Sequence, residues 1–333
     1  MFWSHQLGNS WSSIIFLTPF LGYLCVLVLC VFISFRTRDL FFQWVCLEIN
    51  MLSVIPLLVV KIREDSVLNG LKYFISQRAA SLLFIARVII SSDLRIIILV
   101  RRLAILFKLG VPPFHSWLLS ILPNLGYIEI FILIRIQKFI PLIILRQLKV
   151  SSVTLRIIVG RTLIFLFLRL NKVGSLFILL FLSSRSNGLW ILRGVNRGGQ
   201  WIIFTAIYRL ILGVSLILLR SIKVHKINDL LNTNYVGAMG VGLQFLNVGG
   251  LPPLMGFILK IIIIKVIIHV RLIITITLIL RSLLIIYIYT TTLYEIYCII
   301  DSYELNKPLV GSAAVSILTA LSLLGSGALI WLI

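Results

Sequence analysis

Long apolar stretches fill the chain, and short polar or Gly/Pro-containing stretches separate them. Runs such as Ile261 to Val270, in which Lys265 and His269 are the polar residues, lack the regular alternation of polar and apolar residues that is typical of membrane β-barrels. An α-helix of about 18 to 25 apolar residues crosses a hydrocarbon core of about 30 Å. The pattern predicts eleven spans, at about 13–35, 41–61, 71–92, 94–109, 121–146, 151–169, 173–192, 200–220, 235–268, 271–299 and 310–332.

The composition leaves no room for a soluble domain. Of the 333 residues, 60% are hydrophobic and 12% are charged, whereas soluble domains have about 25% charged residues. We therefore expect an all-α, polytopic integral membrane protein with one transmembrane domain over residues 1–333. No small-residue cleavage site follows the first apolar stretch, so we expect a retained span there and not a signal peptide.

Two of the predicted spans contain residues that interrupt a helix. Pro141 lacks an N–H group and clashes with the carbonyl four residues earlier, so the fifth span must bend or unwind beside Lys138. Gly249 to Pro253 cannot form regular helix, and Lys260 follows two turns later. Lysine precedes one break and follows the other, which is the arrangement that inverted repeats produce. We expect the backbone groups freed at both breaks to line a hydrated cavity.

The lysines predict the orientation of the chain. Those at connections after even-numbered spans are Lys61, Lys72, Lys172, Lys223, Lys226 and Lys307. One lysine, Lys149, follows an odd-numbered span. Since positive charge gathers on the cytoplasmic or matrix side, we expect the N-terminus on that side and the C-terminus on the opposite side.

The formal net charge of +21 does not indicate a nucleic-acid partner, because much of it lies within spans. Arginines inside apolar runs include Arg87, Arg135, Arg161, Arg209 and Arg281. Each costs about 2.5 to 3.5 kcal/mol near the centre of a span, and the chain has only 10 acidic residues.

Isoleucine is abundant, while methionine occurs 4 times. We hypothesise that the sequence is a translation made with an unsuitable codon table, in which many arginines stand for serine or another small residue and many isoleucines for methionine.

Ionisable side chains inside or at the edge of the spans are the candidates for chemistry: Glu48, Lys108, Lys138 and Lys260. A charge in hydrocarbon is costly and marks an ion path with a partner. Burial and neighbouring charges alter proton affinity, so a row of such groups can pass protons. We expect these four residues to form a proton relay. The alternative for a single lysine, above all Lys108, is that its amine snorkels to the membrane interface.

Three further ionisable residues are weaker candidates. His115 titrates near neutral pH and is a possible relay residue; the alternative is a structural hydrogen bond at a helix end. Glu129 lies near the start of a span, where a negative charge stabilises a helix N-terminus. Lys265 lies five residues after Lys260 and is expected to face elsewhere.

The sequence gives no support for a cofactor or metal site in this chain. The cysteines lie in or beside spans without a C-x-x-C pairing, so we expect inert buried thiols: Cys25, Cys30, Cys46 and Cys298. Gly237 to Gly242 is rich in glycine, but no strand precedes it and no acidic residue is placed to bind a ribose. Close helix packing explains these glycines better than nucleotide binding.

Five short blocks follow one another between residues 47 and 260. They are Leu47 to Pro56; Lys72-Tyr73-Phe74 with Gln77, Ala80 and Ser81; Lys108-Leu109-Gly110 with Pro113-Phe114-His115; Gln137-Lys138 with Pro141; and Gly249 to Pro253 with Gly256, Phe257 and Lys260. In residues and order they resemble the second-subunit family of mitochondrial NADH:ubiquinone oxidoreductase, respiratory complex I. The chain departs from the family's pattern at Leu170 to Phe177, which lacks a basic pair, so we assign no role to that turn. Arg78, Arg87 and Arg135 stand where the family tends to have small or hydroxyl residues.

The resemblance implies an antiporter-like membrane-arm subunit with eleven spans that translocates protons. Glu48 would pair with Lys108, Lys138 would be the central relay residue, and Lys260 would lead toward the exit or a neighbouring subunit. Other subunits would hold the FMN, the iron–sulfur clusters and the ubiquinone site, while this chain would hold no cofactor and bind no NADH directly. The expected partners are other membrane-arm subunits and phospholipid, with no nucleic acid.

Two alternatives to this function stay open. A free-standing cation/proton antiporter would share the row of glutamate and lysine residues. A purely structural membrane-arm subunit would have the same fold with a closed channel. Co-purification with flavin and iron–sulfur subunits separates the first alternative, and substitution of Lys138 separates the second.

Overall fold

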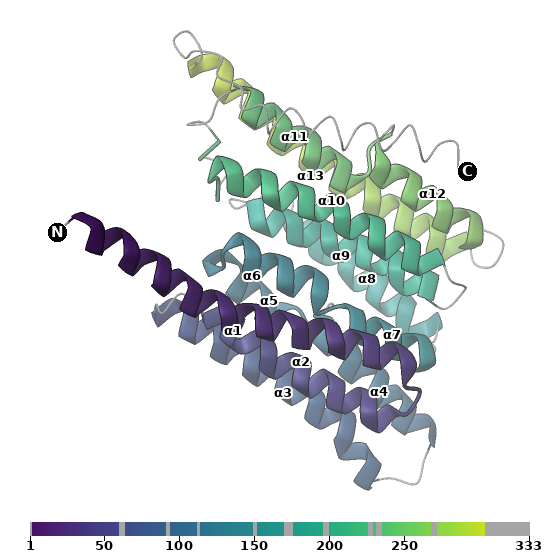
Figure 1. Ribbon diagram of the computed structural model, residues 1–333. Coiled ribbons are helices and arrows are strands. Elements are labelled where there is room, and N and C mark those ends of the chain that lie inside the picture. Colours follow the sequence, from purple (N-terminus) through teal and green to yellow (C-terminus); the bar gives the residue numbers. More distant parts are fainter. Residues whose placement is uncertain are drawn as a thin grey trace. The chain divides into compact units, whose positions relative to one another are not determined.

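The computed structural model describes residues 2–59, 64–90, 94–111, 114–148, 152–169, 176–195, 200–225, 229–230, 235–252, 254–267 and 272–303. These residues are almost entirely helical, and no strand occurs among them (Figure 1). The helices are α1 (Phe2–Arg36), α2 (Leu40–Val59), α3 (Glu64–Ile90), α4 (Leu94–Lys108), α5 (Ser116–Ile121), α6 (Tyr127–Phe131), α7 (Phe139–Leu148), α8 (Ser152–Arg169), α9 (Leu176–Val195), α10 (Gln200–Ile222), α11 (Tyr235–Gly249), α12 (Met255–Ile267) and α13 (Leu272–Tyr303). The expectation of an all-α chain is therefore confirmed for the described residues, while the span expected at 310–332 lies outside them.

Four of the described helices are long and apolar enough to cross a membrane. The spans are Pro19–Arg36, Leu40–Val59, Trp201–Ile222 and Leu272–Tyr294. Large apolar side chains point outward from these helices: Phe32, Leu210 and Ile273 are 68%, 68% and 74% exposed. An outer surface of this kind suits contact with lipid tails, because no water is then left in contact with the apolar groups.

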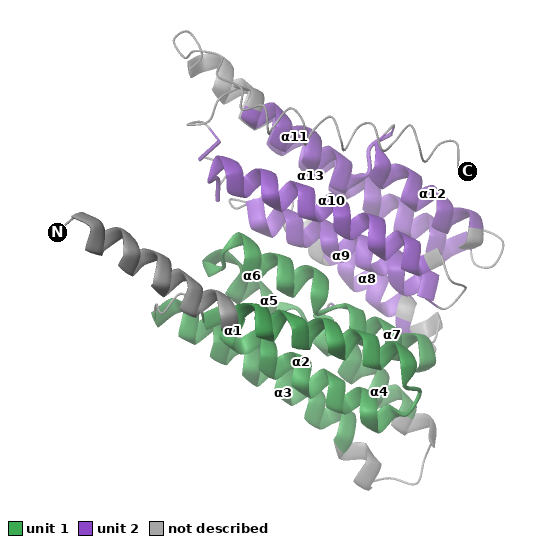
Figure 2. Ribbon diagram, viewed as in Figure 1, with its two compact units in different colours: residues 1–110, 114–148 green, residues 111–113, 149–333 purple. Residues whose placement is uncertain are grey.

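The chain divides into two compact units, coloured in Figure 2. Unit 1 comprises residues 1–110 and 114–148. Within it, helices α1 to α4 pack one against the next, and α7 packs against α1, α2 and α4. The buried positions of α2 recur every three or four residues, which directs one stripe of the helix toward these neighbours.

Unit 2 comprises residues 111–113 and 149–333. Helix α9 lies at its centre and packs against α8, α10, α11, α12 and α13. Of its 20 residues, all are buried except Ile178 and Gly188. Small residues such as Ser183 and Ser184 allow the neighbouring helices to approach closely from several sides.

Both predicted helix breaks are present. The stretch 235–268 is divided into α11 and α12, which end and begin on either side of the Gly249 to Pro253 block. The stretch 121–146 was expected as one bent span, and it is more divided than expected. A 3-10 turn at Leu122–Asn124 contains Pro123, and Gly126 is extended at φ −80° and ψ 168° before α6 begins. A π-helical turn at Ile132–Ile136 then leads to α7.

Candidate functional site

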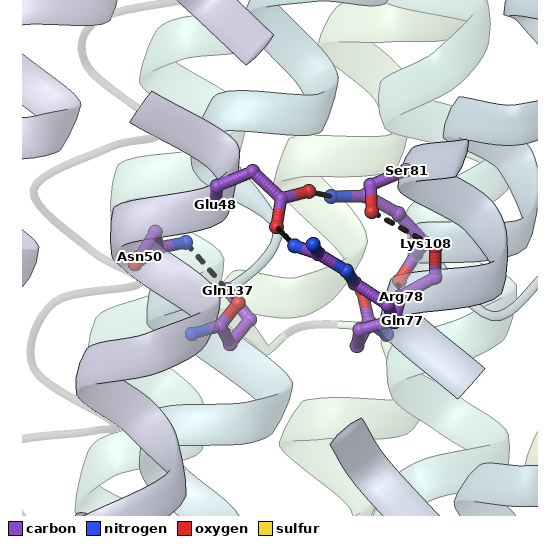
Figure 3. A network of polar contacts seen from close by, with 7 residues as sticks. All are labelled: Glu48, Asn50, Gln77, Arg78, Ser81, Lys108 and Gln137. Carbon is purple, nitrogen blue, oxygen red and sulfur yellow. Dashed lines mark hydrogen bonds and ion pairs between the residues drawn. The ribbon is translucent and has the colours of Figure 1, made fainter. Parts of the chain in front are cut away.

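The carboxylate of Glu48 lies between two cationic side chains (Figure 3). Glu48 is in the middle of α2 and Lys108 ends α4, with exposures of 7% and 8%. Lys108 Nζ is 3.9 Å from Glu48 Oε1, and Arg78 Nη1 donates a hydrogen bond of 2.6 Å to Oε2. The side chain of Arg78 is 47% exposed and that of Lys108 is 3% exposed. Lys108 is therefore the cation that shares the buried environment of the carboxylate.

Helix α4 ends at Lys108 because the backbone becomes left-handed two residues later. Gly110 has a φ of 63°, which glycine adopts at little cost, and its N–H group donates to Phe107 O at 2.8 Å. The side-chain amide of Gln77 donates to Lys108 O at 3.5 Å, so one carbonyl of the last helical turn has a partner. The turn places the Lys108 amine at a buried helix C-terminus, where the helix dipole favours a cation.

A pair of side-chain amides joins α2 to the first broken segment. Asn50 Nδ2 donates a hydrogen bond to Gln137 Oε1 at 3.1 Å, and Asn50 is 1% exposed (Figure 3). Asn50 Oδ1 and Gln137 Nε2 are buried as well and have no hydrogen-bond partner among the described residues. The helix that carries Glu48 is thus bonded directly to the residue before Lys138.

Lys138 lies where the helix is interrupted. The N–H group of Gln137 donates to Ile132 O at 3.2 Å, five residues back, and residues 137 and 138 form a turn before α7 starts. Pro141 lies within the first turn of α7, where a missing N–H group costs least. The prediction that the helix unwinds beside Lys138 is confirmed, and the side chain of Lys138 is half-buried. π-Helical turns occur frequently at functional sites.

Lys260 lies beside the second break, in unit 2. Its side chain is on α12 and the residue is 4% exposed. Lys260 Nζ donates a hydrogen bond to the carbonyl oxygen of Gly249, the last residue of α11. Gly250 follows with a φ of 77° and directs the chain out of the helix. Lys265 is exposed on the same helix, so the expectation that it faces elsewhere is confirmed.

The described contacts bring together Glu48 and Lys108 out of the four relay candidates. Lys138 belongs to the same compact unit and is reached from α2 through the Asn50–Gln137 pair. Lys260 belongs to the other unit. The amides of Asn50 and Gln137 were not identified as site residues from the sequence, although polar residues in apolar spans are a signal that could have found them.

Two weaker candidates lie at helix starts. His115 precedes α5, and its backbone carbonyl accepts hydrogen bonds from Leu118 N and Leu119 N at 3.1 and 3.3 Å, while its side chain makes no capping bond, so its relay role stays a prediction. Glu129 Oε2 accepts a hydrogen bond of 2.6 Å from Gly126 N, three residues back. This bond satisfies a donor at the start of α6, which is what was expected of a charge at a helix N-terminus.

The cysteines are dispersed. Cys30 and Cys46 are buried free thiols, as expected, but Cys25 is exposed on the outer face of α1, so the expectation of burial is wrong for it. The side chain of Cys298 lies outside the described residues. Among the described residues, no group of three or more His, Cys, Asp or Glu side chains is placed to hold a metal ion. The chemistry that the site offers is proton exchange between a carboxylate and amines.

Comparisons with known proteins give relatives of this chain. It is 30% identical over 262 residues to NADH-ubiquinone oxidoreductase chain 2 of Myxine glutinosa, and the match covers 71% of this chain and 74% of that protein. The fold is similar to a chain of respiratory complex I from Thermus thermophilus, with a TM-score of 0.74, 17% identity and coverage of 92% of this chain and 78% of the other. It is also similar to a chain of the Mrp complex from Dietzia, with a TM-score of 0.73, 15% identity and coverage of 93% and 75%. No family model matches the chain.

Proposed function

The chain belongs to the family of NADH-ubiquinone oxidoreductase chain 2 and is an integral membrane protein, and on that premise we propose that it carries protons. It acts as a core membrane-arm subunit of the proton-pumping NADH:ubiquinone oxidoreductase. Protons pass along Glu48, Lys108, Lys138 and Lys260. Electron transfer in other subunits, which hold the FMN, the iron–sulfur clusters and the ubiquinone site, drives their movement, and this chain binds no NADH itself.

The buried Glu48–Lys108 pair is the observation that carries this proposal. Two ionisable residues that are 7% and 8% exposed have side chains 3.9 Å apart in a chain that is otherwise mostly apolar. Desolvation of both charges costs several kcal/mol, so such a pair adds little stability by itself. A pair of this kind suits proton transfer, because removal of one charge changes the proton affinity of the other.

The two lysines at helix breaks extend the path. Each compact unit contains one interrupted helix with a lysine beside it, Lys138 in unit 1 and Lys260 in unit 2. Backbone groups freed at a break need water or polar side chains in a membrane, so a break favours local hydration. We take the two units to be inverted repeats of one antiporter-like domain over residues 1–333, with eleven spans in all.

We also propose that the chain lies in the inner mitochondrial membrane, which its family membership supports. Its N-terminus lies on the matrix side and its C-terminus on the intermembrane-space side, as the distribution of lysines favours. Its partners are the neighbouring membrane-arm subunits and phospholipid.

The test uses Lys138→Met in the assembled complex, reconstituted into lipid vesicles. We expect the number of protons pumped per NADH oxidised to fall, because the amine at the break in unit 1 is lost. Lys265→Met is the matched control: its side chain is exposed, and we expect normal pumping. An unchanged ratio in Lys138→Met would end the proton-path role and favour the structural subunit with a closed channel.

A free-standing cation/proton antiporter is the second candidate, since it would share the row of buried glutamate and lysine residues. Isolation of the chain from its native membrane separates the two. A subunit of the oxidoreductase is isolated with flavin and iron–sulfur proteins. A free-standing antiporter is isolated without them and exchanges cations for protons in vesicles that contain no NADH.

A further inference from the structure

The break between α11 and α12 provides the hydrogen-bond acceptor for Lys260. The last carbonyls of a helix have no partner within that helix, and Gly249 O is one of those at the end of α11. Lys260 Nζ donates to this oxygen. The C-terminal end of a helix carries negative partial charge, so it favours a cation at this place. The position of the amine therefore depends on the geometry of the break.

Asn247 holds the two sides of the break together. Its side-chain oxygen accepts a hydrogen bond of 3.1 Å from the N–H group of Gly256, and Asn247 is 1% exposed. Gly256 is the second residue of α12, and the first N–H groups of a helix have no partner within it. A side chain from the last turn of α11 thus caps the first turn of α12, and Lys260 lies one turn further along α12.

Asn187 fixes the end of α11 from a third helix. Its side-chain nitrogen, on α9, donates to the carbonyl oxygen of Val248 at 3.2 Å, and the residue is 3% exposed. The carbonyl of Val248 is thereby occupied, while the next carbonyl, that of Gly249, accepts from Lys260. Two buried asparagines, neither of them ionisable, therefore bond to the backbone on the two sides of the break.

Two glycines make the close approach sterically possible. A Cβ atom at Gly250 would lie 2.7 Å from Lys260 Nζ and 2.9 Å from Lys260 Cε. A Cβ atom at Gly256 would lie 2.0 Å from the backbone oxygen of Asn247. Since real Cβ atoms do not come this close to other heavy atoms, both positions require glycine for the observed packing.

We propose that Asn247 is a positioning residue for Lys260: its bond to the Gly256 amide keeps the Gly249 carbonyl within reach of the Lys260 amine. This inference rests on the proposed function. It adds Asn247, a residue that makes proton transfer by Lys260 depend on the geometry of the break between α11 and α12. A side-chain amide does not titrate, so Asn247 acts through Lys260 and does not carry the proton.

The first experiment replaces Asn247 in the assembled complex and measures protons pumped per NADH oxidised in lipid vesicles. Asn247→Leu removes the acceptor at nearly constant size, and misplacement of a reacting group by about 1 Å can cost about 100-fold in rate. We expect a loss of pumping as large as in Lys260→Met. Asn247→Asp keeps an oxygen at the same place and should restore much of the pumping. In a Lys260→Met background, Asn247→Leu should cause no further loss.

The second experiment replaces Gly250 by alanine, whose Cβ atom would crowd the Lys260 amine and lie 3.1 Å from the backbone carbon of Gly256, at a φ of 77° that favours glycine. We expect Gly250→Ala to reduce pumping in the assembled complex. Gly188→Ala is the matched control in unit 2, because a Cβ atom there meets no other atom within 4 Å. If Asn247→Leu does not assemble, Gly250→Ala decides the question: normal pumping in this variant would overturn the proposal.

A density map of the Asn247→Leu complex, which shows the position of the Lys260 amine, separates a failure of this inference from a failure of the proposed function. We expect the Lys260 amine to have left the Gly249 carbonyl. If the amine stays on that carbonyl, or if Asn247→Leu pumps normally while Lys260→Met does not, the positioning role is wrong and the proton path stands. If Lys260→Met itself pumps normally, the path through Lys260 is wrong, and the positioning role fails with it.

Discussion

Lys108 Nζ lies 3.9 Å from Glu48 Oε1, beyond hydrogen-bond distance, while the second oxygen of the same carboxylate accepts a bond of 2.6 Å from Arg78. The carboxylate is thus shared between a buried cation and a half-exposed one. The more distant contact is the one within the protein interior, where charge pairs interact more strongly because less solvent screens them. The energetics of the site therefore depend chiefly on Glu48 and Lys108.

Removal of Lys108 alone should destabilise the protein. Lys108→Met leaves Glu48 without its buried partner, and breaking a buried pair costs about 3 to 5 kcal/mol. We expect less assembled complex on a native gel and little pumping. The double variant Glu48→Gln/Lys108→Met removes both charges and should restore assembly but not pumping. If the double variant assembles no better than Lys108→Met, the two residues do not act as a pair.

Removal of Arg78 should have a small effect. Its side chain is 47% exposed, whereas that of Lys108 is 3% exposed and stays beside Glu48 when Arg78 is removed. We expect Arg78→Ser to assemble and pump normally, with Lys108 as the remaining cation beside Glu48. Pumping assays in vesicles and thermal unfolding of the purified complex measure the two effects. A loss of pumping comparable to that of Lys108→Met would make Arg78 part of the relay.

The hydrogen bond between Asn50 and Gln137 predicts that replacing Asn50 lowers the stability of the protein more than replacing Asn69, another buried asparagine. Asn50→Leu leaves the side-chain oxygen of Gln137 without its donor, and an unsatisfied buried polar group costs about 1 to 3 kcal/mol. Asn69 is 0% exposed and neither polar atom of its side chain has a hydrogen-bond partner among the described residues. Asn69→Leu should therefore be neutral or stabilising. Thermal unfolding of the purified complex measures both changes, and equal effects would contradict the role of the amide pair.

A methyl group at Gly256 should prevent normal assembly. The Cβ atom would lie 2.0 Å from the backbone oxygen of Asn247, and a backbone atom cannot move aside as a flexible side chain can. Gly160→Ala is the control in a helix interior, because no atom lies within 4 Å of the added carbon. We expect Gly256→Ala to reduce the amount of assembled complex on a native gel and Gly160→Ala to leave it unchanged. Normal assembly of Gly256→Ala would show that α12 can shift away from α11.

The buried arginines give a prediction about the natural protein. Arg185 is 6% exposed and none of its three side-chain nitrogens has a hydrogen-bond acceptor among the described residues. Its guanidinium group lies 4.9 Å from the ring centroid of Phe181, a cation–π contact that offsets only part of the cost of burial. We therefore extend the codon-table hypothesis to position 185 and expect serine or another small residue there. Peptide mass spectrometry of the protein from its native membrane measures this, and an intact arginine at 185 would contradict the extension.

The helix breaks could be predicted from the sequence because their causes are local. Proline lacks a donor, and the Gly249 to Pro253 block cannot form regular helix. The partner of Glu48 was expected from the family resemblance, and the structure has Lys108 beside it. Charge in an apolar span is conspicuous in a sequence, so the ionisable candidates could be identified without a structure.

The amides that support these residues could not be predicted in the same way. Asn50 and Asn247 are single polar residues in apolar stretches, and such residues frequently bond only to their own helix. Their roles depend on Gln137, 87 residues away, and on a backbone group across a break. The extra division at Pro123 and Gly126 was missed because Pro123 lies in the first turn of the expected span, where proline is tolerated, and a single glycine does not end a helix.

Helix α9 has consequences for how the chain enters a membrane. The helix has a polar stretch that includes Ser183, Ser184 and Asn187 between two apolar ends, and polar residues near the centre of a span weaken its insertion as a single helix. Helix α9 therefore depends on adjacent helices for a favourable free energy of transfer from the translocation machinery into the bilayer. Insertion of this segment should be cooperative with that of α10, the next helix in the chain, so that the centre of unit 2 is completed only when its surrounding helices are synthesised.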